Sequence, residues 1–121
     1  MDSLAGQDVL IIDHDPPTIK LVTVYLKSRG YRCKGFRSGK EGIANLQSIS
    51  PKFILIDPIL PDIDGFVLCE MIKSFRNLNH IPIYFFTTLP IQVIEKKIVN
   101  SHAEGYILKP FDLKDLNILL K

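Results

Sequence analysis

Short runs of consecutive apolar residues recur along the chain, and each has the length of a β-strand. Four of them cover residues 9–12, 53–56, 81–86 and 106–108. Unbroken runs of this kind are typical of strands buried on both faces, as in a parallel sheet. A more polar segment, residues 31–36, predicts a short strand nearer an edge of the sheet.

Apolar residues at helical spacing follow each of these strands and predict five helices. The residues expected to face the core are, in chain order, Ile19, Val22 and Leu26; Ile43 and Leu46; Leu68, Met71, Ile72 and Phe75; Ile91, Ile94 and Ile98; and Leu113, Leu116 and Leu120. The alternation of strands and helices predicts an α/β domain whose parallel sheet is covered on both faces.

Polar residues and prolines at the helix ends support these boundaries. N-caps are predicted at Asp15, ahead of Pro16 and Pro17, at Ser38, which has capping-box spacing to Glu41, and at Asp112. Gly30 is predicted to end the first helix. The fourth helix is expected to reach roughly to His102.

The length and composition are those of one globular domain. We expect residues 1–121 to form it, with residues 1–7 as a loose lead-in, and the chain has no internal repeat or linker. The domain either stands alone or was excised from a longer protein, and the abrupt end at Lys121 slightly favours the second interpretation.

Charge and cysteine content narrow the function classes. The net charge is +2, from 15 basic and 13 acidic residues spread along the chain, so no basic block favours direct nucleic-acid binding. No apolar run is long enough to span a membrane, and no signal peptide begins the chain. Cys33 and Cys69 lack metal-ligand spacing and are interpreted as small core residues in a reducing compartment. We therefore expect a cytoplasmic protein.

The stretch from Phe53 to Gly65 combines a buried strand with turn chemistry. The strand ends on Asp57, because Pro58 cannot donate to a sheet ladder and holds Asp57 extended. A carboxylate at the C-terminal end of a central parallel strand lies where open α/β sheets bind ligands. The alternative is that Asp57 only begins a turn.

Reactive groups also follow the other strands. The strand ends carry the triplet Asp13-His14-Asp15, then Asp57, Thr87 and Lys109. Since parallel strands bring their C-terminal ends to one edge of a sheet, these groups should converge. Each has a simpler explanation alone: Asp15 could only cap a helix, Thr87 could only satisfy a loop backbone, and Lys109 could only be solvated.

This constellation resembles the receiver domains of response regulators, the CheY-like family. The resemblance covers Val9 to about Leu120. It rests on Asp57 followed by Leu60-Pro61 and Asp64-Gly65, on the acidic cluster after the first strand, on Thr87, and on Lys109-Pro110-Phe111. It implies the flavodoxin-like (βα)5 fold, doubly wound, with sheet order 2-1-3-4-5.

The resemblance also implies a role for each site residue. Asp57 would accept a phosphoryl group from a sensor histidine kinase or a phosphotransfer protein, and Lys109 and Thr87 would contact that group. Asp13, Asp57 and the backbone carbonyl of Ile59 would hold Mg²⁺. Tyr106 would change rotamer on activation, and Lys109-Pro110 would be a cis peptide. The fourth helix, fifth strand and fifth helix would form a face that an output protein or domain reads.

Such a domain is not an enzyme in its own right, since it catalyses only its own phosphorylation and dephosphorylation. Its partners would be proteins, with no membrane and no direct nucleic-acid contact. Two copies could also dimerise through the output face, although Glu95, Lys96 and Lys97 are as well explained as a solvated helix surface.

Several residues depart from the family pattern. His14 stands where a second acid is usual, and imidazole is a poor partner for Mg²⁺, so weaker Mg²⁺ binding is expected, with Mn²⁺ better tolerated. Asp15 could compensate only if its loop shifts. Thr88 replaces a small residue, so tighter access to the phosphoryl group is expected. Ile59 and Leu89 are apolar where polar residues are common, which predicts a long-lived phosphoaspartate because a hydrolytic water would be poorly positioned.

Three alternatives remain open. A degenerate receiver could act as a phosphorylation-independent interaction module, as His14 and Thr88 suggest. Asp13-His14-Asp15 also resembles the D-x-D motif of haloacid-dehalogenase-like phosphatases, although the later acidic pair and the cap insertion are lacking. A flavodoxin-like electron carrier would share the fold, but no loop is rich enough in Ser, Thr and Gly to cradle a flavin phosphate.

Overall fold

A computed structural model describes residues 8–109 and 112–120, without the side chain of Ile118. The strands within these ranges are β1 Val9–Ile12, β2 Cys33–Phe36, β3 Phe53–Ile56, β4 Ile83–Thr87 and β5 Gly105–Leu108. The helical elements are α1 Pro16–Ser28, α2 Gly39–Leu46, α3 Gly65–Ser74, α4 Ile91–Ile98 and the 3-10 helix η1 Leu113–Leu119. The predicted lead-in, residues 1–7, and the predicted cis peptide before Pro110 lie outside the described residues.

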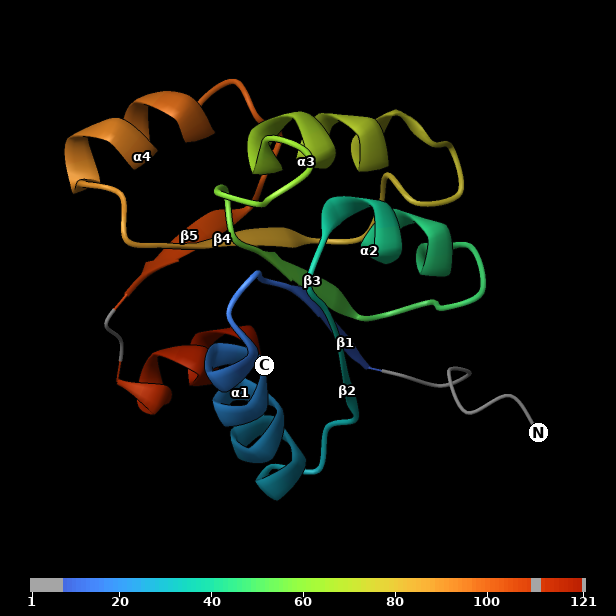
Figure 1. Cartoon of the computed structure of the whole chain (residues 1–121), viewed down its shortest axis with the longest axis vertical. Helices are drawn as coiled ribbons and strands as arrows, with labels where there is room; N and C mark the ends of the chain where they lie inside the picture. Colours follow the sequence, from blue (N-terminus) through green and yellow to red (C-terminus); the bar gives the residue numbers. More distant parts are fainter. Residues whose placement is uncertain (1–7, 110–111, 121) are drawn as a thin grey trace.

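The strands form one parallel sheet in the order β2-β1-β3-β4-β5, which confirms the predicted fold. β1 and β3 are central and pair in register, with Ile12 opposite Ile56. Figure 1 shows α2, α3 and α4 over one face of the sheet and α1 with η1 over the other. The two residues that follow this central pair, Asp13 and Asp57, therefore leave the sheet side by side.

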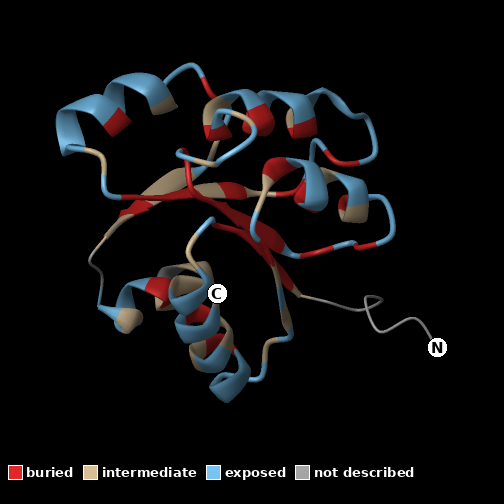
Figure 2. Ribbon diagram, viewed as in Figure 1, coloured by how far each residue is buried: buried red, intermediate tan, exposed pale blue. Residues whose placement is uncertain are grey.

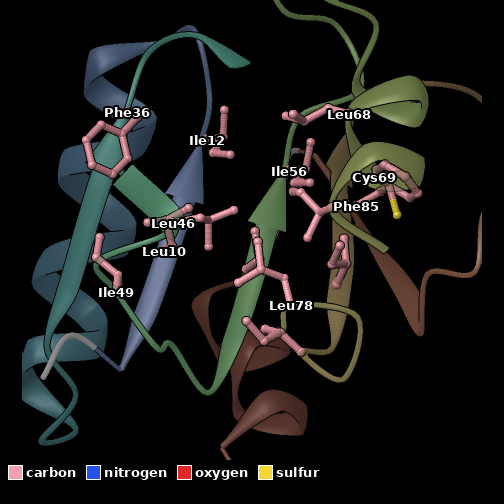
Figure 3. Packing of buried hydrophobic residues seen from close by; sticks show 14 of the residues in the cluster. Leu10, Ile12, Phe36, Leu46, Ile49, Ile56, Leu68, Cys69, Leu78 and Phe85 are labelled. Atoms are coloured by element: carbon pink, nitrogen blue, oxygen red, sulfur yellow. The ribbon is translucent and has the colours of Figure 1, made fainter. Parts of the chain in front are cut away.

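Each face of the sheet has its own apolar cluster, because successive strand residues point to opposite faces. Leu10 and Ile12 pack toward α2 and α3, whereas Val9 and Ile11 pack toward α1 and η1. Figure 3 shows the first cluster, with Ile56 and Phe85 of neighbouring strands among its members. Figure 2 shows that burial concentrates in the strands and the inner helix faces. This core holds the strand ends rigidly.

Most predicted helix ends are confirmed. The carboxylate of Asp15 accepts from the Thr18 amide at 3.2 Å, and the Ser38 hydroxyl accepts from the Glu41 amide at 3.2 Å. Asp112 accepts from the Lys114 amide at 2.9 Å. Gly30 has φ of +87°, the left-handed conformation that ends α1.

Other boundaries were wrong. The last helix is a 3-10 helix, not an α-helix. α4 ends at Ile98 rather than near His102, because the Ser101 hydroxyl donates to the Ile98 carbonyl and His102 has φ of +65°. β2 begins at Cys33 and β4 at Ile83, two residues later than predicted in each case.

The predicted inner faces of α3 and α4 were wrong in part, since Ile91 at the start of α4 is 47% exposed. Met71 and Phe75 are exposed by 38% and 37%, and the buried positions are Gly65, Leu68, Cys69 and Ile72. Met71 lies beside this stripe, and Phe75 has extended backbone because it is the C-cap. Among the described residues, no helix has the length and apolarity to cross a membrane.

Candidate functional site

Asp57 follows β3 directly and is 4% exposed. Its amide donates to the Ile12 carbonyl at 2.9 Å, which extends the ladder between β1 and β3 by one residue. Its Oδ1 accepts from the Ile59 amide at 2.9 Å. Gly65 packs behind it, where an added Cβ would lie 2.5 Å from the Asp57 carbonyl oxygen. The backbone therefore fixes this carboxylate from both sides.

Asp13 follows β1 and is fully buried. Its Oδ1 accepts from the Asp15 amide at 3.0 Å, while its Oδ2 accepts from Lys109 Nζ at 2.7 Å. Burial raises the pKa of Asp13 above its usual value, and the hydrogen bond from Lys109 opposes this rise. A buried carboxylate in such a place needs a cationic neighbour to stay ionised.

Lys109 supplies that cation at the end of β5. Its Nζ lies 3.3 Å from Asp57 Oδ2 as well as 2.7 Å from Asp13, so one ammonium joins both carboxylates. The Lys109 amide donates to the Thr87 carbonyl at 2.6 Å, which anchors the residue to the end of β4. The predicted convergence of Asp13, Asp57 and Lys109 is therefore present.

His14 joins this group, while Asp15 does not. The Nδ1 of His14 lies within hydrogen-bond distance of Asp57 Oδ2, at 3.0 Å, and 3.9 Å from Asp13 Oδ1. Its side chain is 53% exposed. The Asp15 carboxylate is taken by the amide and the hydroxyl of Thr18, at 3.2 and 2.6 Å. Thus the Asp15 carboxylate caps α1 and contacts Thr18 rather than Asp13, Asp57 or Lys109.

Asp13, His14 and Asp57 offer one ligand atom each, and these atoms lie within 4.8 Å of one another. Two carboxylates on a fixed loop suit a divalent cation, because carboxylate oxygens are favourable ligands for Mg²⁺ and Mn²⁺ alike. The third donor is an imidazole nitrogen, which Mg²⁺ rarely takes. The donor set therefore fits a divalent cation, with Mg²⁺ less favoured than it would be by three carboxylates.

A pocket of about 580 Å³ opens above these groups. Its lining includes His14, Asp57, Ile59, Thr88 and Lys109. Ile59 is 56% exposed, so an apolar side chain stands at the pocket rim. The sequence interpretation missed one lining residue, Thr18. Its position three residues after the N-cap Asp15 was the signal that could have placed it there.

Thr87 ends β4 and is fully buried. Its hydroxyl oxygen accepts from the Leu89 amide at 2.9 Å, and the hydroxyl hydrogen remains a potential donor. The exposed Thr88, and not Thr87, lines the pocket. Thr87 thus lies at the end of β4, next in the chain to the lining residue Thr88.

Tyr106 lies on β5 opposite Phe85 of β4, and its half-buried ring packs against the apolar cluster under α4. The Tyr106 hydroxyl donates to Glu95 Oε2 at 3.2 Å. Burial, followed by the hydrogen bond to Glu95, raises the pKa of Tyr106. The ring therefore links β5 to α4. The sequence alone does not distinguish Glu95 from a residue of a solvated helix surface.

The sequence pattern of one family, described as Response regulator receiver domain, matches residues 9–121. The chain belongs to this family. Receiver domains are parts of two-component systems, regulatory rather than enzymes in the usual sense, and they interact with histidine kinases and output domains. This assignment leaves no support for the phosphatase and flavin-carrier alternatives.

Relatives of this receiver include both long and short proteins. The DNA-binding dual master transcriptional regulator RpaA of Synechocystis is 34% identical over 110 residues, which are 89% of this chain and 45% of RpaA. The polar-differentiation response regulator DivK of Brucella ovis is 28% identical over 107 residues, 88% of this chain and 87% of DivK. The receiver thus spans about half the length of the transcriptional regulators that it matches.

Solved structures share the fold. The chemotaxis response regulator CheY4 of Vibrio cholerae superposes with a TM-score of 0.87 at 24% identity, covering 94% of this chain and 95% of CheY4. The receiver domain of the sensor histidine kinase PA1611 from Pseudomonas aeruginosa, solved with a magnesium ion coordinated in its active site cleft, has a TM-score of 0.85 at 25% identity. The match covers 95% of this chain and 94% of the PA1611 receiver chain.

Proposed function

We propose that Asp57 accepts a phosphoryl group from the phosphohistidine of a sensor kinase or a phosphotransfer protein. The observation that carries this proposal is the placement of the Asp57 carboxylate. It lies at the end of the central strand, at the mouth of a pocket, with Asp13 and Lys109 on one side. In the transfer, an Asp57 oxygen forms the new O–P bond as the N–P bond of the phosphohistidine breaks.

The residues of this receiver meet the electrostatic needs of that transfer. The phosphoryl group adds about −1.5 to −2 of charge where one carboxylate stood. Lys109 is already within 3.3 Å of Asp57 Oδ2 and is poised to contact the phosphoryl oxygens. The Ile59 amide donates to Asp57 Oδ1 and orients the other oxygen toward the pocket. A cation at 3.3 Å and a fixed nucleophile are what this chemistry requires.

We propose that a divalent cation assists, held by Asp13, Asp57 and the backbone carbonyl of Ile59. When bound, it would offset the negative charge of the transferring phosphoryl group. The magnesium ion in the cleft of the PA1611 receiver supports a divalent cation at the corresponding site of this chain, either Mg²⁺ or Mn²⁺. Asp13 fits the role because its buried carboxylate is held in place by the Asp15 amide.

The phosphorylated state would then be read at a distance from Asp57. Thr87 and Lys109 are joined through their backbones, so both can move toward a phosphoryl group together. Space vacated near Thr87 would let Tyr106 leave Glu95, which would change the face formed by α4, β5 and η1. We propose that an output protein or domain binds this face, and that two copies of the receiver could also pair there.

The remaining expectations follow from this role. We propose that residues 1–121 act as a single receiver domain in the cytoplasm, where kinases of two-component systems present their phosphohistidines. The domain itself would contact proteins rather than nucleic acid or lipid. Its only chemistry would be its own phosphorylation and dephosphorylation.

Intact-mass measurement after treatment with acetyl phosphate, in the presence of Mg²⁺ or Mn²⁺, tests the proposal. The parent protein should gain one phosphoryl group, and Asp57→Asn should gain none. Asp15→Asn, which keeps a capping side chain, should label like the parent. Labelling of Asp57→Asn at Asp13 or Asp15 would contradict the assignment. Absence of labelling with either metal would favour the phosphorylation-independent interaction module.

A further inference from the structure

His14 occupies a position between the two carboxylates that the proposed phosphotransfer leaves without a role. Its Nδ1 lies 3.0 Å from Asp57 Oδ2 and 3.9 Å from Asp13 Oδ1. We infer that His14 is a direct metal ligand through Nδ1, and that this makes the site selective for transition-metal dications such as Mn²⁺, Co²⁺ or Zn²⁺ over Mg²⁺. The inference rests on the proposed function only for the location of the cation.

The distances between donor atoms fit such a site. Donors held about 2.0–2.2 Å from a zinc-like ion lie about 3.0–3.6 Å from each other at adjacent positions of the coordination sphere. The Nδ1–Oδ2 separation of 3.0 Å already lies in this range, and the Nδ1–Oδ1 separation of 3.9 Å exceeds it by little. A small rotation of the exposed imidazole would therefore complete the donor set.

The loop that carries His14 is held on both sides of this residue. Asp13 is pinned by its amide, which donates to the Phe36 carbonyl at 3.0 Å. Asp15 is pinned by the cap of α1. His14 therefore sits on a loop that is fixed at both of its neighbours, and its half-exposed ring lines the open pocket through which an ion would enter.

Charge and ligand type both act against Mg²⁺. The imidazole replaces an anionic oxygen with a neutral nitrogen, and Lys109 adds a positive charge 2.7 Å from Asp13. Mg²⁺ depends on anionic and neutral oxygens, whereas later first-row dications gain affinity from nitrogen ligands. The loss of one negative charge weakens the binding of every divalent cation. The imidazole nitrogen restores binding affinity only for the transition metals.

A purely structural role for His14 is the competing explanation. In that case its Nδ1–H would only hold the Asp57 carboxylate, and added metal would leave this nitrogen unchanged. If His14 is a ligand, the metal takes Nδ1 and the ring proton resides on Nε2. The two explanations therefore differ in whether added metal binds the Nδ1 atom of His14.

Ring-nitrogen NMR of the protein with Zn²⁺ or Mg²⁺ and no phosphodonor distinguishes them. The three histidines are His14, His80 and His102. With one equivalent of Zn²⁺, the Nδ1 resonance of His14 should shift to a metal-bound position, and Mg²⁺ should leave it in place. The double variant His80→Gln/His102→Asn, which keeps His14, should behave like the parent; asparagine suits the left-handed backbone of His102.

Metal titration gives the second readout. Loss of even an indirect partner of a metal ligand costs about 10–100-fold in affinity, so His14→Gln should weaken Zn²⁺ binding by about tenfold or more. His14→Asp should tighten Mg²⁺ binding and lower the ratio of the Mg²⁺ to the Zn²⁺ dissociation constant by about tenfold or more. An unchanged ratio in His14→Asp, or a Zn²⁺-induced shift only at His80 or His102, would overturn the inference. Because no phosphodonor is present, a failure of phosphorylation leaves these results unaffected.

Discussion

The ammonium of Lys109 lies 2.7 Å from Asp13 Oδ2, although β5 and β1 are separated in the sheet by β4 and β3. The long Lys109 side chain spans this gap and passes over the ring of Phe86, with Nζ 5.0 Å from the ring centroid. It also reaches Asp57. The single ammonium group of Lys109 therefore compensates the charge of two buried carboxylates. If it is removed, these charges stay buried without compensation.

Replacing Lys109 with methionine should destabilise the protein. Removing one partner of a buried ion pair costs about 3–5 kcal/mol, because the other charge stays buried without compensation. Chemical denaturation in urea measures this change. Adding Asp13→Asn to Lys109→Met should recover a large part of the loss, since the uncompensated charge is then gone. Lys114→Met, at an exposed position, should stay within about 0.5 kcal/mol of the parent. Equal losses in both single variants would contradict the ion-pair account.

Removing the Thr87 hydroxyl should uncouple the phosphoryl group from the face formed by α4, β5 and η1. Thr87→Ala should still accept phosphate at Asp57 but respond weakly in conformation, because the hydroxyl can no longer hydrogen-bond the phosphoryl oxygen. Amide NMR with and without beryllofluoride, a mimic of the phosphoryl group, measures this response over residues 91–108. Thr87→Ser keeps the hydroxyl and should respond like the parent. If Thr87→Ala shifts as far as Thr87→Ser, another residue couples the two sites.

Gly65→Ala should perturb the site from behind. The new Cβ would lie 2.4 Å from the Pro58 Cα and 2.5 Å from the Asp57 carbonyl oxygen, and neither backbone atom can rotate away. Overpacking of this kind costs about 1–3 kcal/mol. Gly105→Ala is the matched control, because its Cβ meets only the Tyr84 ring at 3.3 Å. Thermal unfolding should show a clear loss for Gly65→Ala alone, together with changed amide shifts at Asp57 and Ile59.

Both cysteines should be poorly reactive in the folded protein. Burial raises the pKa of the Cys33 thiol to about 11 and that of the Cys69 thiol to about 12. Since the thiolate is the nucleophile, a rise from 9.0 to about 11 lowers its fraction at pH 8 about 100-fold. Alkylation by iodoacetamide should therefore be slow in buffer and fast in urea. Cys69→Ser isolates Cys33, the less buried of the two. Rapid alkylation of this variant in buffer would contradict the raised pKa.

Local sequence patterns determined the order of elements and several of their ends. Unbroken apolar runs identified the central strands, because a strand buried on both faces has no polar position. Asp15 and Ser38 identified helix starts, because each satisfies an amide only three residues away. These are short-range effects, and a sequence displays them directly. Met71 and Phe75 were misplaced because helical spacing alone does not say how wide a stripe the neighbouring elements cover.

Only the tertiary structure decided which groups meet at the strand ends. The sequence pointed to Asp13, Asp57 and Lys109 as neighbours, but not to the single ammonium that contacts both carboxylates. It also left open whether His14 or, after a loop shift, Asp15 takes the place of the missing acid. The contacts of the two side chains depend on the path of the loop between β1 and α1. This path places the Asp15 carboxylate at the cap of α1 and the His14 ring beside Asp57. Contacts across 43 or 96 residues depend on sheet order and side-chain direction, and local patterns carry neither.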